Sequence, residues 1–235
     1  MSQNSGMELQ RLSWKQVDER EPNVAVLPVG STEQHGPHNP LGTDATVAIE
    51  LARHACESTD ALLLPPVHVG VAEHHRNFSG TLYVSPDTMR AYVREVLESV
   101  AGHSPDAVVV VNGHGGNSAA LEEACARLSR EEIIFATVWE WFTTRDEDVG
   151  HGGKYETSIN LHLTPEDVGE PVRGDAEEWG EYVNGAAVVY DTDEFTSNGV
   201  TGDAREANAE IGEMIFEEST ADLIELIEWV RENRV

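Results

Sequence analysis

The sequence predicts one α/β domain of three layers, in which a central, mainly parallel β-sheet is flanked by helices. Short apolar runs alternate with longer amphipathic segments along the chain, which is the pattern of strands joined by helical crossovers. The chain has 235 residues, of which 40% are hydrophobic, enough to bury one sizeable core. We find no internal repeat and no low-complexity linker, so we expect residues 1–235 to form a single domain.

The first predicted elements lie between residues 24 and 67. Val24–Val29 is a continuous apolar run, which is typical of a buried strand. Ala45–Cys56 has the pattern of a helix, with Thr43 or Asp44 near its start. Ala61–Val67 resembles a strand, but its two consecutive prolines predict that it ends early, because proline cannot donate to a sheet.

The remaining elements continue the alternation of helix and strand. Pro86–Ala101 is predicted as a helix, with Ser85 as N-cap and proline at the first helical position. Ala107–Val111 is the clearest buried strand, because it contains only alanine and valine. Further along, we expect a helix at Asn117–Arg130, a strand at Ile133–Val138, a short strand at Ala187–Tyr190 within irregular residues 169–202, and a mostly helical Ala204–Arg231.

The chain is strongly acidic, with 15 Lys and Arg against 43 Asp and Glu and a formal charge of −28. This charge argues against binding to nucleic acid or to an anionic membrane, because both require a basic face. Thirteen of the basic residues are arginine and two are lysine. Abundant acid with little lysine favours a protein adapted to a salt-rich cytoplasm, where screening weakens self-repulsion, over ordinary acidic drift.

Targeting and redox signals are absent from the sequence. Met1–Gln10 is polar and lacks the apolar segment of a signal peptide, and no run approaches 18 apolar residues. Cys56 and Cys125 do not form a Cys-x-x-Cys pair, so we expect both thiols to be reduced and buried. These features together predict a cytoplasmic protein.

Three loops rich in imidazole and carboxylate groups follow the predicted strands. In such sheets ligands bind beyond the carboxyl ends of the strands, so these loops are the expected site. Carboxylate and imidazole without thiolate suit Zn, Mn, Fe or Co. Two ions that share one carboxylate can hold a hydroxide between them and polarise a carbonyl. The candidate ligands are Glu33, His35, Asp44, His114 and Glu156.

Each of these motifs also has a simpler interpretation. A lone Glu-x-His pair is common in acidic proteins, and the Gly-rich turn 112–117 could bind phosphate, although it lacks the Lys-Ser/Thr of a P-loop. His151 and Glu156 would also suit the start of a solvated helix. His74 and His75 are by default exposed loop residues that could line the mouth of a pocket. No G-x-S-x-G motif is present, which sets nucleophilic serine hydrolysis aside.

Three ordered motifs resemble the signatures of the creatininase family of metal-dependent amidohydrolases. They are LPVGSTEQHGPHNPLGTD at Leu27–Asp44, VNGHGGN at Val111–Asn117 and HGGKYETS at His151–Ser158, with a weaker similarity in GVTGDAREAN at Gly199–Asn208. The resemblance implies an oligomer, often a hexamer, with two divalent ions per subunit, which we expect to be Zn, Fe or Mn.

The resemblance also implies a role for each ligand. It assigns Glu33 and His114 to one ion and His35 and Glu156 to the other, with Asp44 as the bridge. His151 matches the histidine that transfers a proton to the leaving nitrogen. This set agrees with the ligands that loop position and donor chemistry suggest.

The sequence departs from the creatinine-hydrolysing members of the family at three places. Gly115 and Gly116 replace a Tyr-Glu pair, and Glu147 stands where those enzymes place a tryptophan. Trp139 and Trp141 are the remaining candidates for stacking on a substrate ring. These departures argue against creatinine as the substrate.

The two glycines resemble instead those of family members that deformylate a formylaminopyrimidine ribotide or trim a redox peptide. Our first expectation is therefore deformylation of 2-amino-5-formylamino-6-ribosylaminopyrimidin-4(3H)-one 5'-monophosphate, in archaeal riboflavin and F420 biosynthesis. The alternatives are creatinine hydrolysis, the trimming peptidase and, as a different class, a non-catalytic metal-binding oligomer. The expected substrate is a small molecule that can carry a phosphate, bound by Gly115, Gly116, Asn117 and His74.

Overall fold

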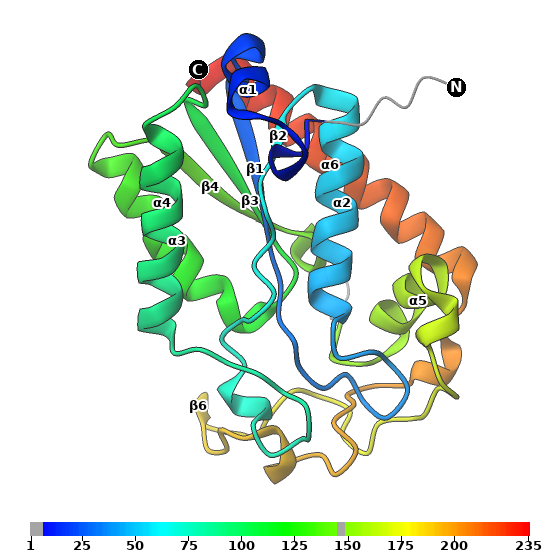
Figure 1. The fold of residues 1–235 in the computed structure, drawn as a ribbon. Helices are drawn as coiled ribbons and strands as arrows, with labels where there is room; N and C mark the ends of the chain where they lie inside the picture. The colour runs from blue at the N-terminus through cyan, green and yellow to red at the C-terminus, as the bar shows by residue number, and fades with distance from the viewer. Residues whose placement is uncertain (1–6, 145–148) are drawn as a thin grey trace.

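The computed structural model describes residues 7–144 and 149–235. In this part of the chain a four-stranded parallel sheet, ordered β2-β1-β3-β4, lies between two layers of helices (Figure 1), which confirms the predicted three-layer α/β fold. The strands are β1 (Val24–Val29), β2 (Leu62–Leu63), β3 (Ala107–Asn112) and β4 (Phe135–Glu140), with a separate hairpin of β5 (Tyr182–Val183) and β6 (Ala186–Ala187). The helices are α1 (Trp14–Arg20), α2 (Thr43–Thr59), α3 (Pro86–Ala101), α4 (Ser118–Arg130), α5 (Lys154–Leu163) and α6 (Ala209–Arg234).

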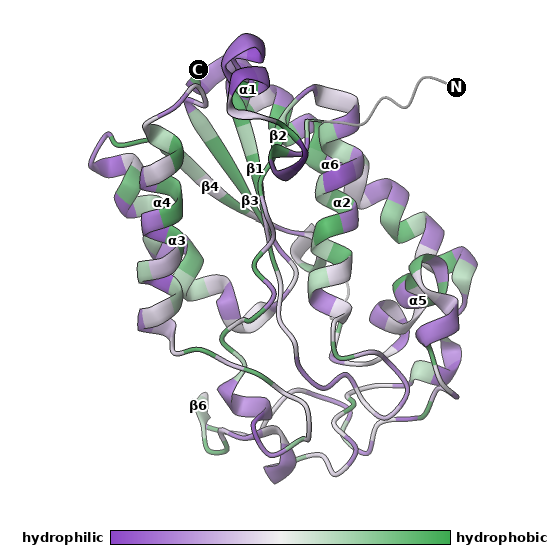
Figure 2. Ribbon diagram, viewed as in Figure 1, coloured by the Kyte–Doolittle hydropathy of each residue, from purple (hydrophilic) through white to green (hydrophobic). Residues whose placement is uncertain are grey.

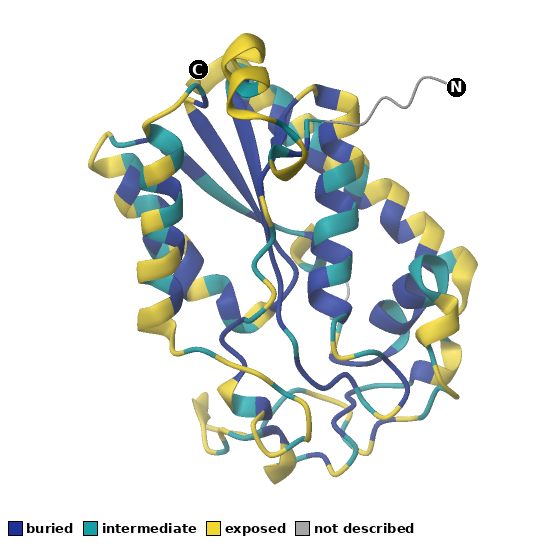
Figure 3. Ribbon diagram, viewed as in Figure 1, coloured by how far each residue is buried: buried dark blue, intermediate teal, exposed yellow. Residues whose placement is uncertain are grey.

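Successive residues of the central strands point to opposite helical layers. Val24 and Val26 of β1 pack in one cluster with α2 and α6, whereas Ala25 and Leu27 pack in a second cluster with α3 and α4. This alternation follows from the two-residue repeat of a strand. Because both faces are covered, β1 and β3 are buried along their whole length and strongly hydrophobic, as Figures 2 and 3 show.

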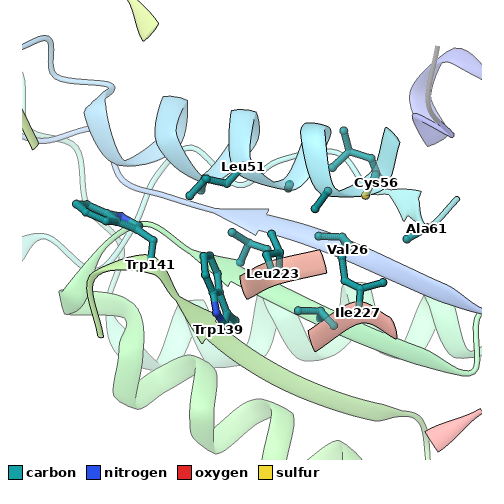
Figure 4. Packing of buried hydrophobic residues seen from close by; sticks show 14 of the residues in the cluster. Val26, Leu51, Cys56, Ala61, Trp139, Trp141, Leu223 and Ile227 are labelled. Carbon is teal, nitrogen blue, oxygen red and sulfur yellow. The ribbon is translucent and has the colours of Figure 1, made fainter. Parts of the chain in front are cut away.

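The cluster beneath α2 contains the largest fully buried side chain, Trp141. Leu51 of α2 and Leu223 and Ile227 of α6 meet over the sheet near Val26, as Figure 4 shows. Trp141 lies in the same cluster and is 1% exposed. Full burial of each leucine or isoleucine in this cluster contributes on the order of 1.5–3 kcal/mol. The core therefore fixes the sheet on which the functional loops stand.

The first half of the chain follows the sequence predictions closely. β1 and α3 have the predicted bounds, and the Ser85 hydroxyl accepts the expected capping bond from the Thr88 N–H. α2 begins earlier than predicted, so Asp44 lies in its first turn. The predicted strand at residues 61–67 is reduced to β2, because its two prolines interrupt the ladder before the Val67 N–H donates to Pro28 over 2.9 Å.

The second half differs from the predictions mainly at the ends of elements. A 3₁₀ turn at Gly115–Asn117 precedes α4, and β4 lies two residues later than expected. The predicted helix at residues 204–231 is divided, because the Asn208 side chain caps a new helix by accepting from the Ile211 N–H. The short strand predicted at residues 187–190 is instead β6, paired with β5. Helix α1 was not predicted.

Two further predictions concern the thiols and the membrane. Cys56 and Cys125 are buried and free, as expected. None of the helices in residues 7–144 and 149–235 has the length and apolar character that a bilayer crossing requires.

Candidate metal centre

The ends of β1 and β3 bring two of the predicted loops together. Val29 pairs with Asn112 at the last position of the two neighbouring strands. The Gly113 N–H then donates to the Val29 carbonyl over 2.9 Å, so the chain leading to His114 stays beside the loop that follows β1. Asp44 enters the same region from the first turn of α2. The carboxyl edge of the sheet therefore carries the site, as expected for this architecture.

Asp44 lies between the imidazoles of two different loops. Its Oδ1 is 3.0 Å from Nε2 of His35, and its Oδ2 is 3.3 Å from Nδ1 of His114. Oε1 of Glu33 lies 3.1 Å from Nδ1 of His114, and Oε1 of Glu156 lies 3.7 Å from Nε2 of His35. The structure thus brings all five predicted ligands together, in two groups that share Asp44.

The donor atoms of this centre are buried and incompletely hydrogen-bonded. Glu33 and His35 are fully buried, and Asp44 is nearly so. Oε1 of Glu33, Nε2 of His35 and Oδ2 of Asp44 lack a hydrogen-bond partner among the described residues. Ligand atoms of these three side chains lie within 4.8 Å of one another. Because buried charged groups require a partner, this oxygen and nitrogen donor set fits divalent ions.

The neighbouring charges keep the carboxylates ionised. Burial acts to raise the pKa of Glu33, but the adjacent His114 imidazole outweighs it and holds this pKa well below its ordinary value. Burial acts to lower the pKa of His35, but Asp44 and Glu156 raise it well above its ordinary value. Burial likewise acts to lower the pKa of His114, but Glu33 and Asp44 raise it well above its ordinary value. The cluster therefore favours carboxylate anions, which are the form that binds a cation.

Backbone carbonyls orient both ligand imidazoles. Nδ1 of His35 lies 3.2 Å from the Glu33 carbonyl, and Nε2 of His114 lies 3.0 Å from the Val71 carbonyl. A carbonyl oxygen only accepts, so each of these ring nitrogens carries the proton. In the neutral ring the other nitrogen is a lone-pair donor facing Asp44, and the contact with the carbonyl is the usual outer support of a metal-binding histidine.

His151 lies against this centre, with a ligand atom within 4.8 Å of those of His35 and Glu156. Its ring centroid is 4.4 Å from that of His35 and 4.5 Å from that of His75. Its Nε2 is 2.8 Å from both the carbonyl oxygen and the side-chain nitrogen of Gln34. Burial, together with His35 and His75, lowers the pKa of His151 to about 3, so the ring is neutral at neutral pH.

His75 is a member of the site that the sequence did not indicate. We expected an exposed loop residue, but the side chain is fully buried. Its Nε2 lies 3.3 Å from Oε1 of Glu33, and its Nδ1 lies 3.0 Å from the Gln34 amide nitrogen and 2.9 Å from the Thr192 hydroxyl. The expectation was wrong because distant segments cover this residue. His74, its neighbour, is half-buried and lines a cavity.

This cavity opens over the candidate ligands and has a volume of about 560 Å³. Glu33, Asp44, His114, Glu156 and His151 line one part of it. Gly115 and Gly116, which we expect to contact the substrate, line it too. A Cβ at Gly115 would meet no atom within 4 Å, whereas one at Gly116 would lie 2.3 Å from Nε2 of His114, so the second glycine is required by packing.

Asn117 is not a cavity residue, contrary to the expectation from its motif. Its Oδ1 accepts from the Val71 N–H at 2.8 Å and its Nδ2 donates to the Gly30 carbonyl at 3.1 Å, so the side chain is fully engaged inside the protein. Its role is to tie three loops together. His38, from the first motif, also lies elsewhere and contacts the Thr157 hydroxyl at 3.0 Å.

Aromatic residues of the cavity come from a segment that the sequence analysis treated as loop. Trp179, Tyr182, Tyr190 and Phe195 line the cavity and carried no recognisable motif. The tryptophans considered for stacking, Trp139 and Trp141, lie in the hydrophobic core instead, and Phe142 reaches the cavity. Glu147 lies outside the described residues.

A family model and solved structures of known proteins both match this chain and agree on one family. The family model described as "Creatininase: Creatinine amidohydrolase" matches residues 10–227. A solved structure of a mutant creatininase superposes with a TM-score of 0.84 at 24% identity, covering 97% of this chain and 99% of that one. Two other solved creatininases, with TM-scores of 0.81 and 0.82 at 22% and 23% identity, are titled Zn-Zn type and Mn. These likenesses establish the fold.

Curated relatives have several activities. The mycofactocin precursor peptide peptidase of Mycolicibacterium smegmatis is 36% identical over 208 residues, which cover 83% of this chain and 80% of that protein. The 2-amino-5-formylamino-6-ribosylaminopyrimidin-4(3H)-one 5'-monophosphate deformylase of Methanothermobacter marburgensis is 31% identical over 142 residues, or 60% of this chain and 59% of that protein. The deformylase that the sequence analysis favoured is thus the more distant of the two. From the matched motifs, fold and relatives, the chain belongs to the creatininase family of metal-dependent amidohydrolases.

Proposed function

We propose that the chain hydrolyses an amide bond of a small peptide substrate with the help of two divalent ions. The observation that carries this proposal is the position of Asp44, whose two oxygens face the imidazoles of His35 and His114. In this assignment Glu33 and His114 would hold one ion and His35 and Glu156 the other, with Asp44 shared between the two groups. Zn, Mn and Fe all suit these ligands.

The protein contributes charge, position and proton transfer. When bound, the two ions would supply Lewis acidity, which polarises the scissile carbonyl and acidifies the attacking water. Three buried carboxylates, Glu33, Asp44 and Glu156, supply the compensating negative charge. His151, neutral and buried beside them, takes up a proton and delivers it to the departing nitrogen. Gly115 leaves open space for the substrate.

A peptide substrate is favoured over the phosphorylated ribotide by two observations. The peptidase relative is more similar than the deformylase relative and matches over a longer part of the chain. In addition, none of the cavity-lining residues that the structure describes is Lys or Arg, while Glu181 adds a further acid to the wall. A phosphate held away from the proposed ions would therefore find no Lys or Arg side chain to pair with. We propose the peptidase in place of the deformylase as the first candidate.

Substrate profiling of metal-loaded protein tests this assignment. Short peptide amides, the formylaminopyrimidine ribotide and creatinine would be offered to protein prepared with Zn, Mn or Fe. We expect release of amine from the peptide amides. Turnover of the ribotide or of creatinine alone would overturn the proposed substrate class, and stoichiometric metal binding without any turnover would identify a non-catalytic metal protein.

The proposal extends to the solution state of the protein. The charge of −28 with only two lysines supports a salt-rich cytoplasm as the working environment, and the family precedent supports a homo-oligomer such as a hexamer. We expect the midpoint of thermal unfolding to rise from dilute buffer to molar KCl. A midpoint that does not depend on salt would contradict the salt-rich environment. A monomeric mass measured by light scattering would contradict the homo-oligomer.

A further inference from the structure

The cavity has a second, aromatic part beside the candidate metal centre. We propose that Trp179, Phe195, Tyr182 and Tyr190 form a subsite for an aromatic side chain of the substrate, on a residue adjoining the amide bond that is cleaved. This inference rests on the proposed amide hydrolysis, since it specifies the substrate of the same site. All four side chains line the cavity together with the candidate ligands.

Trp179 is the inner member of this subsite. Its indole makes edge-on contacts with the rings of His75 and His151, with centroids 5.5 Å apart in each case, and with Phe195 at 5.1 Å. The indole therefore stands against the histidine that we assign to proton transfer. A ring bound next to Trp179 lies beside the reacting bond and can adopt the offset or edge-to-face packing that aromatic pairs prefer.

The outer members of the subsite expose large aromatic surfaces. Tyr182 is 61% exposed and Tyr190 is 76% exposed, although both line the cavity. Tyr182 is the first residue of β5 and Tyr190 follows β6, in a hairpin whose turn contains Asn184 and Gly185 at positive φ angles. Exposed aromatic side chains gathered at the mouth of a cavity are typical of a binding site.

The chain segment that carries the four aromatic residues, residues 179–195, is anchored to the turn that carries His75. The Thr192 hydroxyl lies 2.9 Å from Nδ1 of His75, and the Asn77 amide donates to Asp193 over 2.8 Å. Arg76 pairs with Asp191 at 2.5 Å. Three consecutive residues of this segment are thus bound to the turn that carries His75. Such anchoring holds the subsite at a fixed position relative to the candidate ligands.

Charge narrows the kind of group that the subsite accepts. Lys and Arg are missing from the described residues that line the cavity, and Glu181 lies beside Tyr182. A neutral aromatic ring loses little by entering such a wall, whereas a phosphate or carboxylate on that ring would lie near Glu181 with no basic side chain to pair with. The favoured occupant is therefore a phenylalanine- or tyrosine-like side chain.

Matched peptide amides test the subsite through selectivity. Pairs that differ only by Phe or Ala, placed on either side of the scissile bond, would be compared with metal-loaded protein. We expect kcat/KM to favour Phe by about 10–100-fold on one side, as burial of an aromatic side chain allows. Trp179→Ala should reduce this ratio toward one, while Trp229→Ala, which removes an exposed indole from α6, should retain it.

Equal rates for Phe and Ala in the parent protein would overturn the subsite while leaving amide hydrolysis intact. An unchanged ratio in Trp179→Ala would overturn it as well. If that variant fails to fold, Tyr190→Ala provides the same test, because this exposed side chain contributes little to the core. A parent preference that survives Tyr190→Ala undiminished would then count against the proposal.

A binding measurement separates the subsite from the chemistry. Calorimetry would compare N-acetyl-phenylalaninamide with N-acetylalaninamide on the full-length, metal-loaded protein. Tighter binding of the aromatic probe, lost in Trp179→Ala, supports the subsite even if no amide is cleaved, in which case only the proposed function fails. Equal affinity for the two probes contradicts the subsite whatever the activity.

Discussion

Gln34 contacts the Nε2 atom of His151 with both its backbone carbonyl and its side-chain nitrogen, each at 2.8 Å. The same side-chain nitrogen lies 3.1 Å from the Gly199 carbonyl and 3.0 Å from Nδ1 of His75. An amide carries only two protons, and the Gly199 carbonyl takes one of them. The two contacts at Nε2 of His151 therefore exclude each other as hydrogen bonds: a protonated Nε2 donates to the Gln34 carbonyl, whereas an unprotonated Nε2 accepts from the Gln34 amide. In the first case Nδ1 is the acceptor of the ring, and in the second case Nδ1 carries the proton.

Gln34→Leu should lower kcat by about 10–100-fold, because the ring of His151 loses the side chain that fixes its orientation. We expect the metal content and KM to stay near the parent values, since the five candidate ligands are unchanged. Steady-state kinetics with metal analysis of the same samples checks this. A parent kcat, or loss of bound metal, would show that Gln34 has another role.

His151→Ala should retain both ions and lose activity by about 10²–10⁴-fold, the usual worth of a general acid or base. The imidazole lies close to His35 and Glu156, but its Nε2 contacts Gln34, and the five assigned ligands are all unchanged in this variant. Elemental analysis and single-turnover rates would be measured together. Full activity in this variant would remove His151 from the mechanism.

Asp44→Asn should release at least one ion per chain and abolish turnover, because this carboxylate faces both ligand imidazoles. Asp87→Asn is the matched control, since that carboxylate is 91% exposed at the start of α3. We also expect added Zn or Mn to raise the melting temperature of the parent and of the control, but far less that of Asp44→Asn. Equal metal stoichiometry in all three proteins would refute the bridging assignment.

Gly113→Ala should reduce the free energy of unfolding by about 1–3 kcal/mol, the range typical of overpacking. A Cβ at this position would lie 2.2 Å from the Asp44 carbonyl oxygen, which is backbone and cannot move aside easily. Gly115→Ala is the control, because its Cβ would point into open space and should change stability by less than about 0.5 kcal/mol. Denaturant unfolding of the two variants measures the difference, and similar losses would contradict the close approach.

Cys125 should not react with iodoacetamide at pH 8 while the protein is folded. Burial raises the pKa of its thiol to about 12, and burial also raises the pKa of Cys56, so neither forms the reactive thiolate. Mass spectrometry should detect two modified thiols only after unfolding in denaturant. Rapid labelling of the native protein would show that α2, which carries Cys56, or α4, which carries Cys125, opens readily.

The sequence predicted best those elements whose signals are local. The bounds of β1 and α3 follow from a continuous apolar run and from Ser85 followed by proline. The division of the last predicted helix was missed. In the sequence, the N-cap residue Asn208 cannot be distinguished from any other polar residue within an amphipathic run. Strand ends were also misplaced, since β4 is defined by its pairing with β3.

The candidate ligands were predictable because parallel strands end at one edge, which gathers loops that are distant in sequence. His75 and Trp179 were not, because their positions depend on contacts with residues far along the chain, such as Thr192 and Phe195. The hydrophobic periodicity of the sequence does not indicate contacts between residues so far apart in the chain. Asn117 shows the opposite error, since a motif residue beside the site has a purely structural set of hydrogen bonds.

The aromatic segment also has an evolutionary consequence. The candidate ion ligands all lie between Glu33 and Glu156, on loops and on the first turns of α2 and α5, whereas the aromatic wall lies at residues 179–195 around the β5–β6 hairpin. Substitutions or changes of length in that hairpin leave the ligand-bearing framework untouched. Substrate choice can thus diversify among descendants of one ancestor while the hydrolytic apparatus is inherited, and the hairpin is the natural starting point for laboratory redesign of selectivity.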